Sequence, residues 1–438
     1  MKKFLILTAA AVAVFASCAK TIDHTRNTGP GDAVSFGVYS PKTVTKAVSD
    51  ADFGTIDNNV LGNASGSGFG VFAYYTDNND YASGSYYANF MYNQQVKGNG
   101  DGTAAATAWS YSPIKYWPNE HGASAISTGT DKLTFLAYAP WVDIKAKGED
   151  SGSTVKDSEG NEATEGIIMM TGNHEASDAL LIFKVPASTA NQVDLLYGVL
   201  KEQSENVDGT AEGTVNSPIE NLTKEKTGGK VSILFKHALA KFEIDVKEVV
   251  DQPAPTSSVN PGQGVDPNWT KVVVKSLNIL STDLGTQGNL NLYTGNWNVT
   301  STTTSFPIDP LPTSIKAEAD PVVAYPTVAG VVEGGLVDDK IDVMLIPAAT
   351  SKVTGVEIVY YVCTKDENLY GGVSIVENHI TKYFDTDGSA DGNQPLAIEK
   401  GKQYNINVLL GLTSVKLTAS VENWDDDDYN IDLPQNVS

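Results

Sequence analysis

The segment KFEIDV (241–246) decides the fold class, because its apolar and charged residues alternate one by one. In an extended chain its three apolar residues share one face and its three charged residues share the other. The segments QYNINV (403–408) and VKLTASVENW (415–424) alternate in the same way. One buried face and one hydrated face are typical of antiparallel β-sheet, so we predict such sheets at these positions.

The remaining sequence also favours an all-β fold. No window holds a convincing apolar helical stripe beyond short pieces such as HALAK (237–241). The chain of 438 residues contains 39 Gly and 19 Pro, and these separate many short apolar segments. Many short strands between polar turns predict β-sandwiches rather than an α/β architecture.

Two polar stretches interrupt the strand pattern and suggest where domains meet. Residues 144–166 predict a long surface loop, and residues 201–229 contain almost nothing that could enter a core. The strand pattern resumes at VSILF (231–235), so we place a domain junction within 201–229. The predicted divisions are an N-terminal β-sandwich domain, a linker and a C-terminal β-sandwich domain with a terminal extension strand: 47–205, 206–229 and 230–438.

The first residues indicate export. Two lysines precede an apolar run over residues 4–15, which is too short to span a bilayer and has the proportions of a signal peptide. Small residues then lead directly into Cys18, as in a bacterial lipoprotein signal, although Phe15 stands where leucine is usual. We expect residues 1–17 to be removed and the thiol of Cys18 to carry a diacylglyceryl group. The alternative is an ordinary secretory signal followed by an incidental cysteine.

The second cysteine, Cys363, would have no disulfide partner if Cys18 carries lipid. It lies in VEIVYYVCT (356–364), an apolar segment that predicts a strand. We therefore interpret Cys363 as a small core residue, and the absence of a neighbouring histidine or asparagine argues against catalysis.

The negative charge of the chain and its scarcity of arginine argue against several kinds of binding partner. Without residues 1–17 the chain has 28 basic against 53 acidic residues. Such a surface repels nucleic acid and anionic lipid head groups. Arg26 is the only arginine, which almost excludes a phosphate or carboxylate site built on guanidinium groups.

The sequence offers little support for metal, cofactor or catalytic sites. None of the five histidines has a second His or Cys at metal-ligand spacing, and His237 is interpreted as a packing or hydrogen-bonding residue. The segment GNASGSGFG (62–70) leads into a strand, whereas a phosphate loop or a nucleophile elbow requires a helix there. We predict no enzyme activity, cofactor or metal site. The five histidines are His24, His121, His174, His237 and His379.

One acidic turn resembles a loose calcium loop. DTDGSADGN (385–393) places Asp385, Asp387 and Asp391 around glycines, but Gly388 stands where an EF-hand needs a spacer. A solvated turn is the favoured interpretation, and calcium stays an alternative.

Several segments together resemble the fimbrillin family, lipoprotein subunits of the type V pilus of Gram-negative bacteria. They follow one another in the order and spacing of that family over nearly the whole mature chain. The segments are VSFGVYSPKTVTKA (34–47), GFGVFAYY (68–75), Trp109 with IKYWP (114–118), LTFLAYAP (133–140), DLLYG (194–198), VSILFKHALAKFEIDV (231–246) and GKQYNINVLLGLTSVKLTASVENW (401–424).

The resemblance implies two transthyretin-like antiparallel β-sandwich domains and a structural role. Such subunits are exported as lipoproteins to the outer membrane, trimmed by a surface protease and polymerised by strand exchange into a fimbria that supports adhesion. The expected partners are further copies of the subunit together with tip and anchor subunits. The alternative is a monomeric surface lipoprotein that binds glycans or host ligands through exposed aromatic residues.

The N-terminal strand carries the predicted assembly site. In VSFGVYS (34–40), Val34, Phe36 and Val38 point to one face, as in a buried strand that trimming would displace. The resemblance places trimming at a step from a basic residue to alanine.

That step is Lys46–Ala47, which makes residues 18–46 a propeptide that includes the first strand. Arg26 is the rival site and the only one for a strictly arginine-specific protease. A cut there would free the lipid and leave the strand in place.

The C-terminus offers a candidate donor strand. Beyond the acidic run DDDD (425–428), Tyr429, Ile431 and Leu433 alternate with polar residues. These three side chains could fill alternate pockets in a neighbouring subunit, which favours a stalk role over a tip role. The simpler interpretation is that residues 429–433 pair with their own sheet.

Overall fold

A computed structural model of the protein describes residues 33–39, 56, 58–103, 106–118, 131–146, 152–171, 179–200, 218–248, 269–318, 324–332, 336, 340–384, 395–411 and 415–424. These residues form 21 β-strands and only four short helical segments, α1 (Asn58–Gly62), η1 (Tyr81–Ser83), η2 (Thr189–Asn191) and α2 (Lys224–Thr227). The predicted all-β fold is confirmed. None of the described helices is long and apolar enough to cross a membrane.

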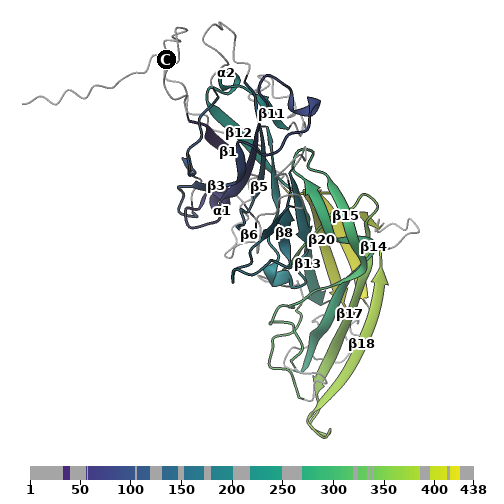
Figure 1. Ribbon diagram of the computed structural model, residues 1–438. Coiled ribbons are helices and arrows are strands. Elements are labelled where there is room, and N and C mark those ends of the chain that lie inside the picture. The colour runs from purple at the N-terminus through teal and green to yellow at the C-terminus, as the bar shows by residue number, and fades with distance from the viewer. Residues whose placement is uncertain are drawn as a thin grey trace, which may run out of the picture.

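The first sheet is built mainly from N-terminal strands, in the order β1-β12-β10-β5-β2-β3-β4, with β11 beside β5 (Figure 1). Its strands are β1 (Ser35–Tyr39), β2 (Phe69–Tyr75), β3 (Met91–Gly98), β4 (Trp109–Ser110), β5 (Leu133–Ala139), β10 (Leu196–Leu200), β11 (Ile219–Leu222) and β12 (Lys230–His237).

The other two sheets make up the rest of the molecule. The four-stranded sheet has the order β16 (Ile341–Leu345), β13 (Ala240–Glu248), β20 (Lys402–Leu410), β21 (Val415–Asn423). The nine-stranded sheet has the order β18 (Val373–Tyr383), β17 (Lys352–Lys365), β14 (Thr270–Asn291), β9 (Leu180–Lys184), β8 (Gly166–Met170), β7 (Ser153–Val155), β6 (Ile144–Ala146), while β15 (Trp297–Pro307) pairs with β14 and β19 (Leu396–Ala397) with β17.

Most described strand pairs are antiparallel, as the alternation predicts, but two are parallel. These are β1 with β12 and β13 with β20. In the second pair Phe242 stands opposite Tyr404, and their rings stack with centroids 4.9 Å apart. The apolar face of KFEIDV is buried as predicted. Its other face is not entirely hydrated, because Lys241 is also buried and forms an ion pair with Asp342 at 3.2 Å.

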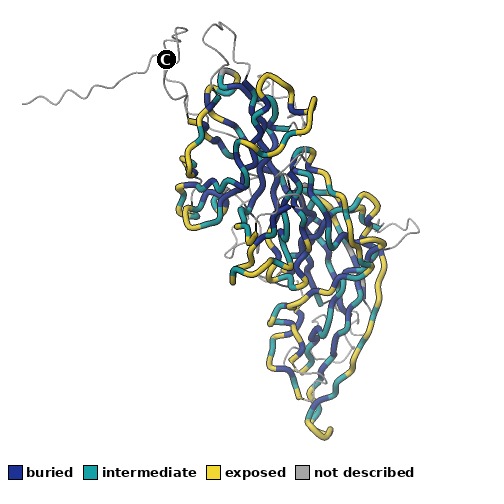
Figure 2. The backbone as a smooth tube through the Cα atoms, in the orientation of Figure 1, coloured by how far each residue is buried: buried dark blue, intermediate teal, exposed yellow. Residues whose placement is uncertain are grey.

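The central strands β2 and β5 of the first sheet are buried on both faces, which joins the two halves of the molecule (Figure 2). Phe69 and Phe135 belong to a core cluster within the N-terminal half. Phe72 and Tyr138, on the opposite face of the same strands, belong to a second cluster that continues into Phe242 and the other two sheets. Strand β5 is buried at every residue, and its sequence LTFLAYA is apolar except for Thr134.

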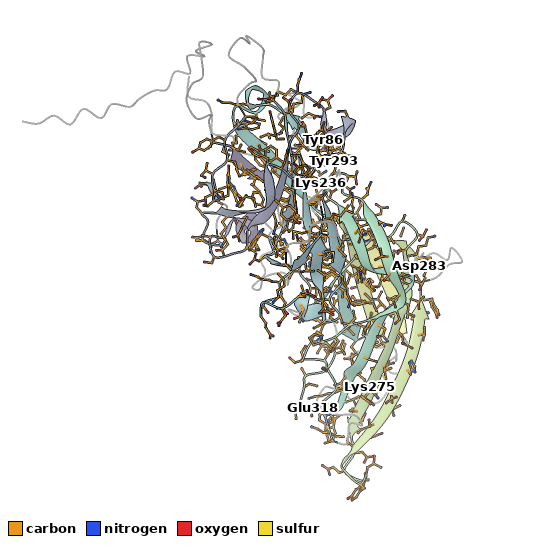
Figure 3. The ribbon with its side chains drawn as sticks, in the orientation of Figure 1. Tyr86, Lys236, Lys275, Asp283, Tyr293 and Glu318 are labelled. Atoms are coloured by element: carbon orange, nitrogen blue, oxygen red, sulfur yellow. The ribbon has the colours of Figure 1, made fainter. Side chains whose placement is uncertain are left out.

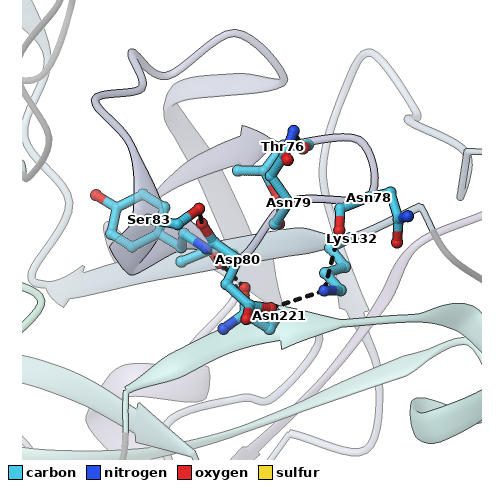
Figure 4. A network of polar contacts seen from close by, with 9 residues as sticks. Thr76, Asn78, Asn79, Asp80, Ser83, Lys132 and Asn221 are labelled. Atoms are coloured by element: carbon cyan, nitrogen blue, oxygen red, sulfur yellow. Dashed lines mark hydrogen bonds and ion pairs between the residues drawn. The ribbon is translucent and has the colours of Figure 1, made fainter.

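A polar loop after β2 helps to hold this junction. Lys132 Nζ lies 2.7 Å from a carboxylate oxygen of Asp80, and the amide of Tyr81 donates to Asn221 Oδ1 at 2.8 Å (Figure 4). These bonds place the Tyr81 ring 5.2 Å from that of Tyr293 in the C-terminal half. The ring of Tyr86 also stacks on that of Tyr81, with centroids 6.0 Å apart, and Figure 3 shows Tyr86 and Tyr293 close together.

The chain does not pass from one sheet to another at the domain boundary that we predicted. Strand β12 (Lys230–His237) was expected to open the C-terminal domain, yet it pairs with β1 and β10 in the first sheet. Strands β6 to β9 were expected in the N-terminal domain, yet they join β14 in the nine-stranded sheet. Alternation shows which residues share a face but not which strands pair, so this assignment could not come from the sequence pattern. The division into two transthyretin-like domains stays a prediction.

Two expected loops also contain ordered structure. Residues 144–166 were expected to form one surface loop, but they include β6 and β7. The expected linker over 206–229 includes β11 and α2. Ile219 and Leu222 of β11 are buried opposite Phe135 and Leu133 of β5, so two apolar residues in a polar stretch are enough to extend the core.

Cys363 lies in β17 and is fully buried, which confirms its interpretation as a core residue of a strand. Burial raises the pKa of its thiol to about 11. Because the thiolate is the reactive form, very little of this cysteine is in that form at neutral pH.

Candidate functional site: strand β1 and its seat

Strand β1 is the terminal strand of the first sheet. It runs parallel to β12, in a register from Ser35 opposite Lys230 to Tyr39 opposite Leu234. Strand β12 pairs on its other side with β10. Removal of β1 would therefore break one ladder and leave the rest of the sheet continuous.

The side chains of β1 alternate as the sequence predicts. Val34 and Phe36 are only 2% and 4% exposed, and Val38 is half-buried against the same cluster. Phe36 is the central contact, because its ring meets three other aromatic rings edge-on. The centroid distances are 5.9 Å to Phe69, 5.6 Å to Tyr111 and 6.0 Å to Phe135.

Backbone groups at the start of β1 are also bonded. The amide of Val34 donates to the carbonyl of Lys115 at 2.9 Å, and the amide of Ser35 donates to the carbonyl of Gly229 at 3.2 Å. The Tyr111 hydroxyl donates to the carbonyl of Val34 at 2.8 Å. Burial raises the pKa of Tyr111, so this hydroxyl keeps its proton and remains a donor.

We call Phe69, Tyr111, Phe135 and the edge of β12 that pairs with β1 the β1 seat. Without β1, the amides and carbonyls on this edge of β12 would lose their partners, and the three rings would lose Phe36. Unpaired strand edges and exposed apolar surface both favour binding of another strand. The β1 seat can therefore hold an extended segment with apolar residues at every second position.

The other predicted site residues lie outside the described residues. They are Cys18, Arg26, Lys46, Ala47, Tyr429, Ile431, Leu433 and the calcium alternative at Asp385, Asp387 and Asp391. Within the described part of the chain, no group of three or more His, Cys, Asp or Glu side chains could hold a metal ion.

The sequence did not reveal the partners of His237. Its Nδ1 lies 2.7 Å from Asp194 Oδ2, and both side chains are buried. Its ring stacks on that of Trp424 with a centroid distance of 3.9 Å. His237 ends β12, so the strand that pairs with β1 also contacts the residue that precedes the acidic run 425–428. The role of His237 in packing and hydrogen bonding is confirmed.

The whole-chain pattern identifies the family. A family model described as fimbrillin-like matches residues 45–424. The chain belongs to the fimbrillin-like family. No curated protein matches the sequence.

Solved structures are similar to this fimbrillin-like chain. One is a fimbrial protein from Bacteroides vulgatus, with 19% identity and a TM-score of 0.52 over 90% of this chain and 100% of that chain. Two are described as candidate cell adhesion proteins, from Bacteroides uniformis and Bacteroides ovatus. The first has 14% identity and a TM-score of 0.42 over 90% of this chain and 98% of that chain. The second has 13% identity and a TM-score of 0.42 over 91% of this chain and 100% of that chain.

Proposed function

We propose that this fimbrillin-like protein is a structural subunit of a cell-surface pilus that supports adhesion and polymerises by donor-strand exchange. The observation that carries the proposal is the position of β1, a terminal strand whose Phe36 fills an aromatic site in the core. A strand of this kind can leave without dividing its sheet, and the vacated seat can then accept a strand from a neighbour.

Proteolysis between Lys46 and Ala47 provides the release step. This bond follows β1 in the sequence, so cleavage there separates both the strand and the lipid anchor from the rest of the subunit. Cleavage at Arg26 would separate the anchor alone and leave the seat occupied. Of the two sites, only Lys46 connects trimming to assembly.

The donor is the C-terminal segment. Tyr429, Ile431 and Leu433 repeat the two-residue spacing of Val34, Phe36 and Val38. A contact between the C-terminus of one subunit and the seat of the next is head-to-tail, so it produces a filament rather than a closed dimer.

The subunit reaches the outer membrane as a lipoprotein and becomes part of the fimbria after trimming. Its partners are further copies of the subunit together with tip and anchor subunits, and a stalk position is favoured because the chain has a donor segment of its own. Membership in a family of fimbrial proteins supports this structural role over an enzymatic one.

Lipidation at Cys18 is the first test. Metabolic labelling with a fatty-acid analogue is expected to mark the wild-type chain and to leave Cys18→Ala unlabelled, because the thiol is the only attachment point of the lipoprotein pattern. Equal labelling of the two chains would contradict lipidation at this residue.

The start of the assembled chain tests the proposed function directly. N-terminal sequencing of subunits from surface polymers is expected to begin at Ala47. Lys46→Gln should block assembly, because β1 would keep the seat filled, while Arg26→Gln should have no effect. Polymers made of chains that still contain Val34 to Ser40 would overturn the proposal.

A further inference from the structure

Strand β18 (Val373–Tyr383) forms the outer margin of the nine-stranded sheet (Figure 1). It pairs with β17 along its whole length, from Val373 opposite Lys365 to Tyr383 opposite Gly355. Strand β21 lies close to part of it, but no described strand forms a ladder with its other edge. A free edge of 11 residues is long enough to pair with another chain through backbone hydrogen bonds.

The exposed side chains of β18 do not repel a neighbour. Val376 and Tyr383 are 53% and 61% exposed, and Figure 2 shows the strand exposed along the margin of the molecule. The negative charge of Glu377 and the positive charge of Lys382 cancel within β18, whereas the whole chain has a net charge of −23. The edge is therefore an almost neutral region on an acidic protein.

The sequence of β18 is complementary to itself. If two copies pair antiparallel about Asn378, Glu377 of each copy stands opposite His379 of the other. In the same register Val376 stands opposite Ile380. A shift of one copy by two residues in one direction places Glu377 opposite Glu377, and a shift in the other direction places His379 opposite His379. A carboxylate opposite an imidazole can form a hydrogen bond, whereas two carboxylates opposite each other repel, so the Glu377–His379 pairing favours the register centred on Asn378 over the shift that places Glu377 opposite Glu377.

Contacts within the chain orient Glu377 and His379. Glu377 lies 3.5 Å from Lys275 Nζ, which Figure 3 labels on β14. His379 Nε2 lies 2.9 Å from Glu357 Oε1, and this contact lowers the pKa of Glu357. The His379 side chain is still 60% exposed and therefore available to a second copy.

We propose that the free edge of β18 docks a second copy of this chain, in an antiparallel pair centred on Asn378. This contact joins two chains side by side and uses neither the β1 seat nor residues 429–433. It is therefore independent of the proposed head-to-tail assembly and would associate filaments laterally.

The test is the oligomeric state of the full chain carrying Cys18→Ala, which cannot take up lipid at that site and keeps β1 in place. Analytical ultracentrifugation at about 0.15 M salt, where exposed charges are screened beyond about 8 Å, is expected to show a concentration-dependent dimer. Glu377→Lys and His379→Glu should each weaken dimerisation about tenfold, because the first removes both Glu377–His379 pairs and the second places a glutamate opposite each Glu377.

A mixture of the two single variants provides the decisive result. In the mixed dimer the introduced lysine faces the introduced glutamate, and the original Glu377 and His379 face each other, so association should return to at least the original strength. Misfolding of either variant would not produce such a rescue.

A matched pair of substitutions tests the apolar contact. Val376→Lys should weaken the dimer, whereas Val60→Lys, at a residue of α1 that is 50% exposed, should not. A chain that stays monomeric up to about 0.1 mM, or variants that dimerise as the parent does, would overturn the proposal. In that case the charged side chains of β18 would serve to keep its edge from pairing with another chain.

Discussion

A chain that ends at Asp428 is expected to form no polymer, although it should fold and be trimmed as the full chain is. The truncation removes Tyr429, Ile431 and Leu433, the three apolar residues proposed to occupy the β1 seat of the next subunit. It keeps every residue of that seat. Without a donor, main-chain pairing and apolar burial at the head-to-tail contact are both lost.

The measurement is the ladder of heat-resistant species on gels of unboiled surface extracts. The matched control ends at Leu433, so it lacks only PQNVS (434–438) and should give the normal ladder. The truncated chain keeps an acceptor seat, so in a mixture with the full chain it should end growing filaments and shorten the ladder. A normal ladder from the chain that ends at Asp428 would show that the donor lies elsewhere.

Replacing Phe36 by alanine is expected to destabilise the untrimmed chain by about 3–5 kcal/mol, as is usual for a large buried aromatic residue. The side chain is 4% exposed and meets three aromatic rings, so its loss leaves a cavity that the β-sheet cannot easily close. Because β1 has only one ladder, the weakened strand should also detach more readily.

Urea unfolding, followed by tryptophan fluorescence, measures this effect, since Trp117 belongs to the same core cluster. Ser35→Ala is the matched control on the other face of β1. It removes one hydroxyl contact to Gly229 and should cost about 1 kcal/mol. A loss below about 1 kcal/mol for Phe36→Ala would contradict the described core position of β1.

The proposed assembly site could be predicted in part from sequence. Val34 and Phe36 were assigned to a buried face, and the structure buries both. Their neighbours Phe69, Tyr111 and Phe135 could not be named, because these contacts join residues far apart in the chain. The same holds for the pairing of His237 with Asp194 and Trp424.

The sequence by itself indicated which residues of a strand share a face, because alternation along a strand is a local property of the extended backbone. It thus established the all-β class and the burial of Phe242 in KFEIDV and of Tyr404 in QYNINV. Only the tertiary structure decided which strands pair. It placed β12 in the first sheet, brought Ile219 from an expected linker into the core, and buried Lys241 against Asp342. Each of these depends on a partner distant in sequence, which no local pattern of apolar and polar residues can identify.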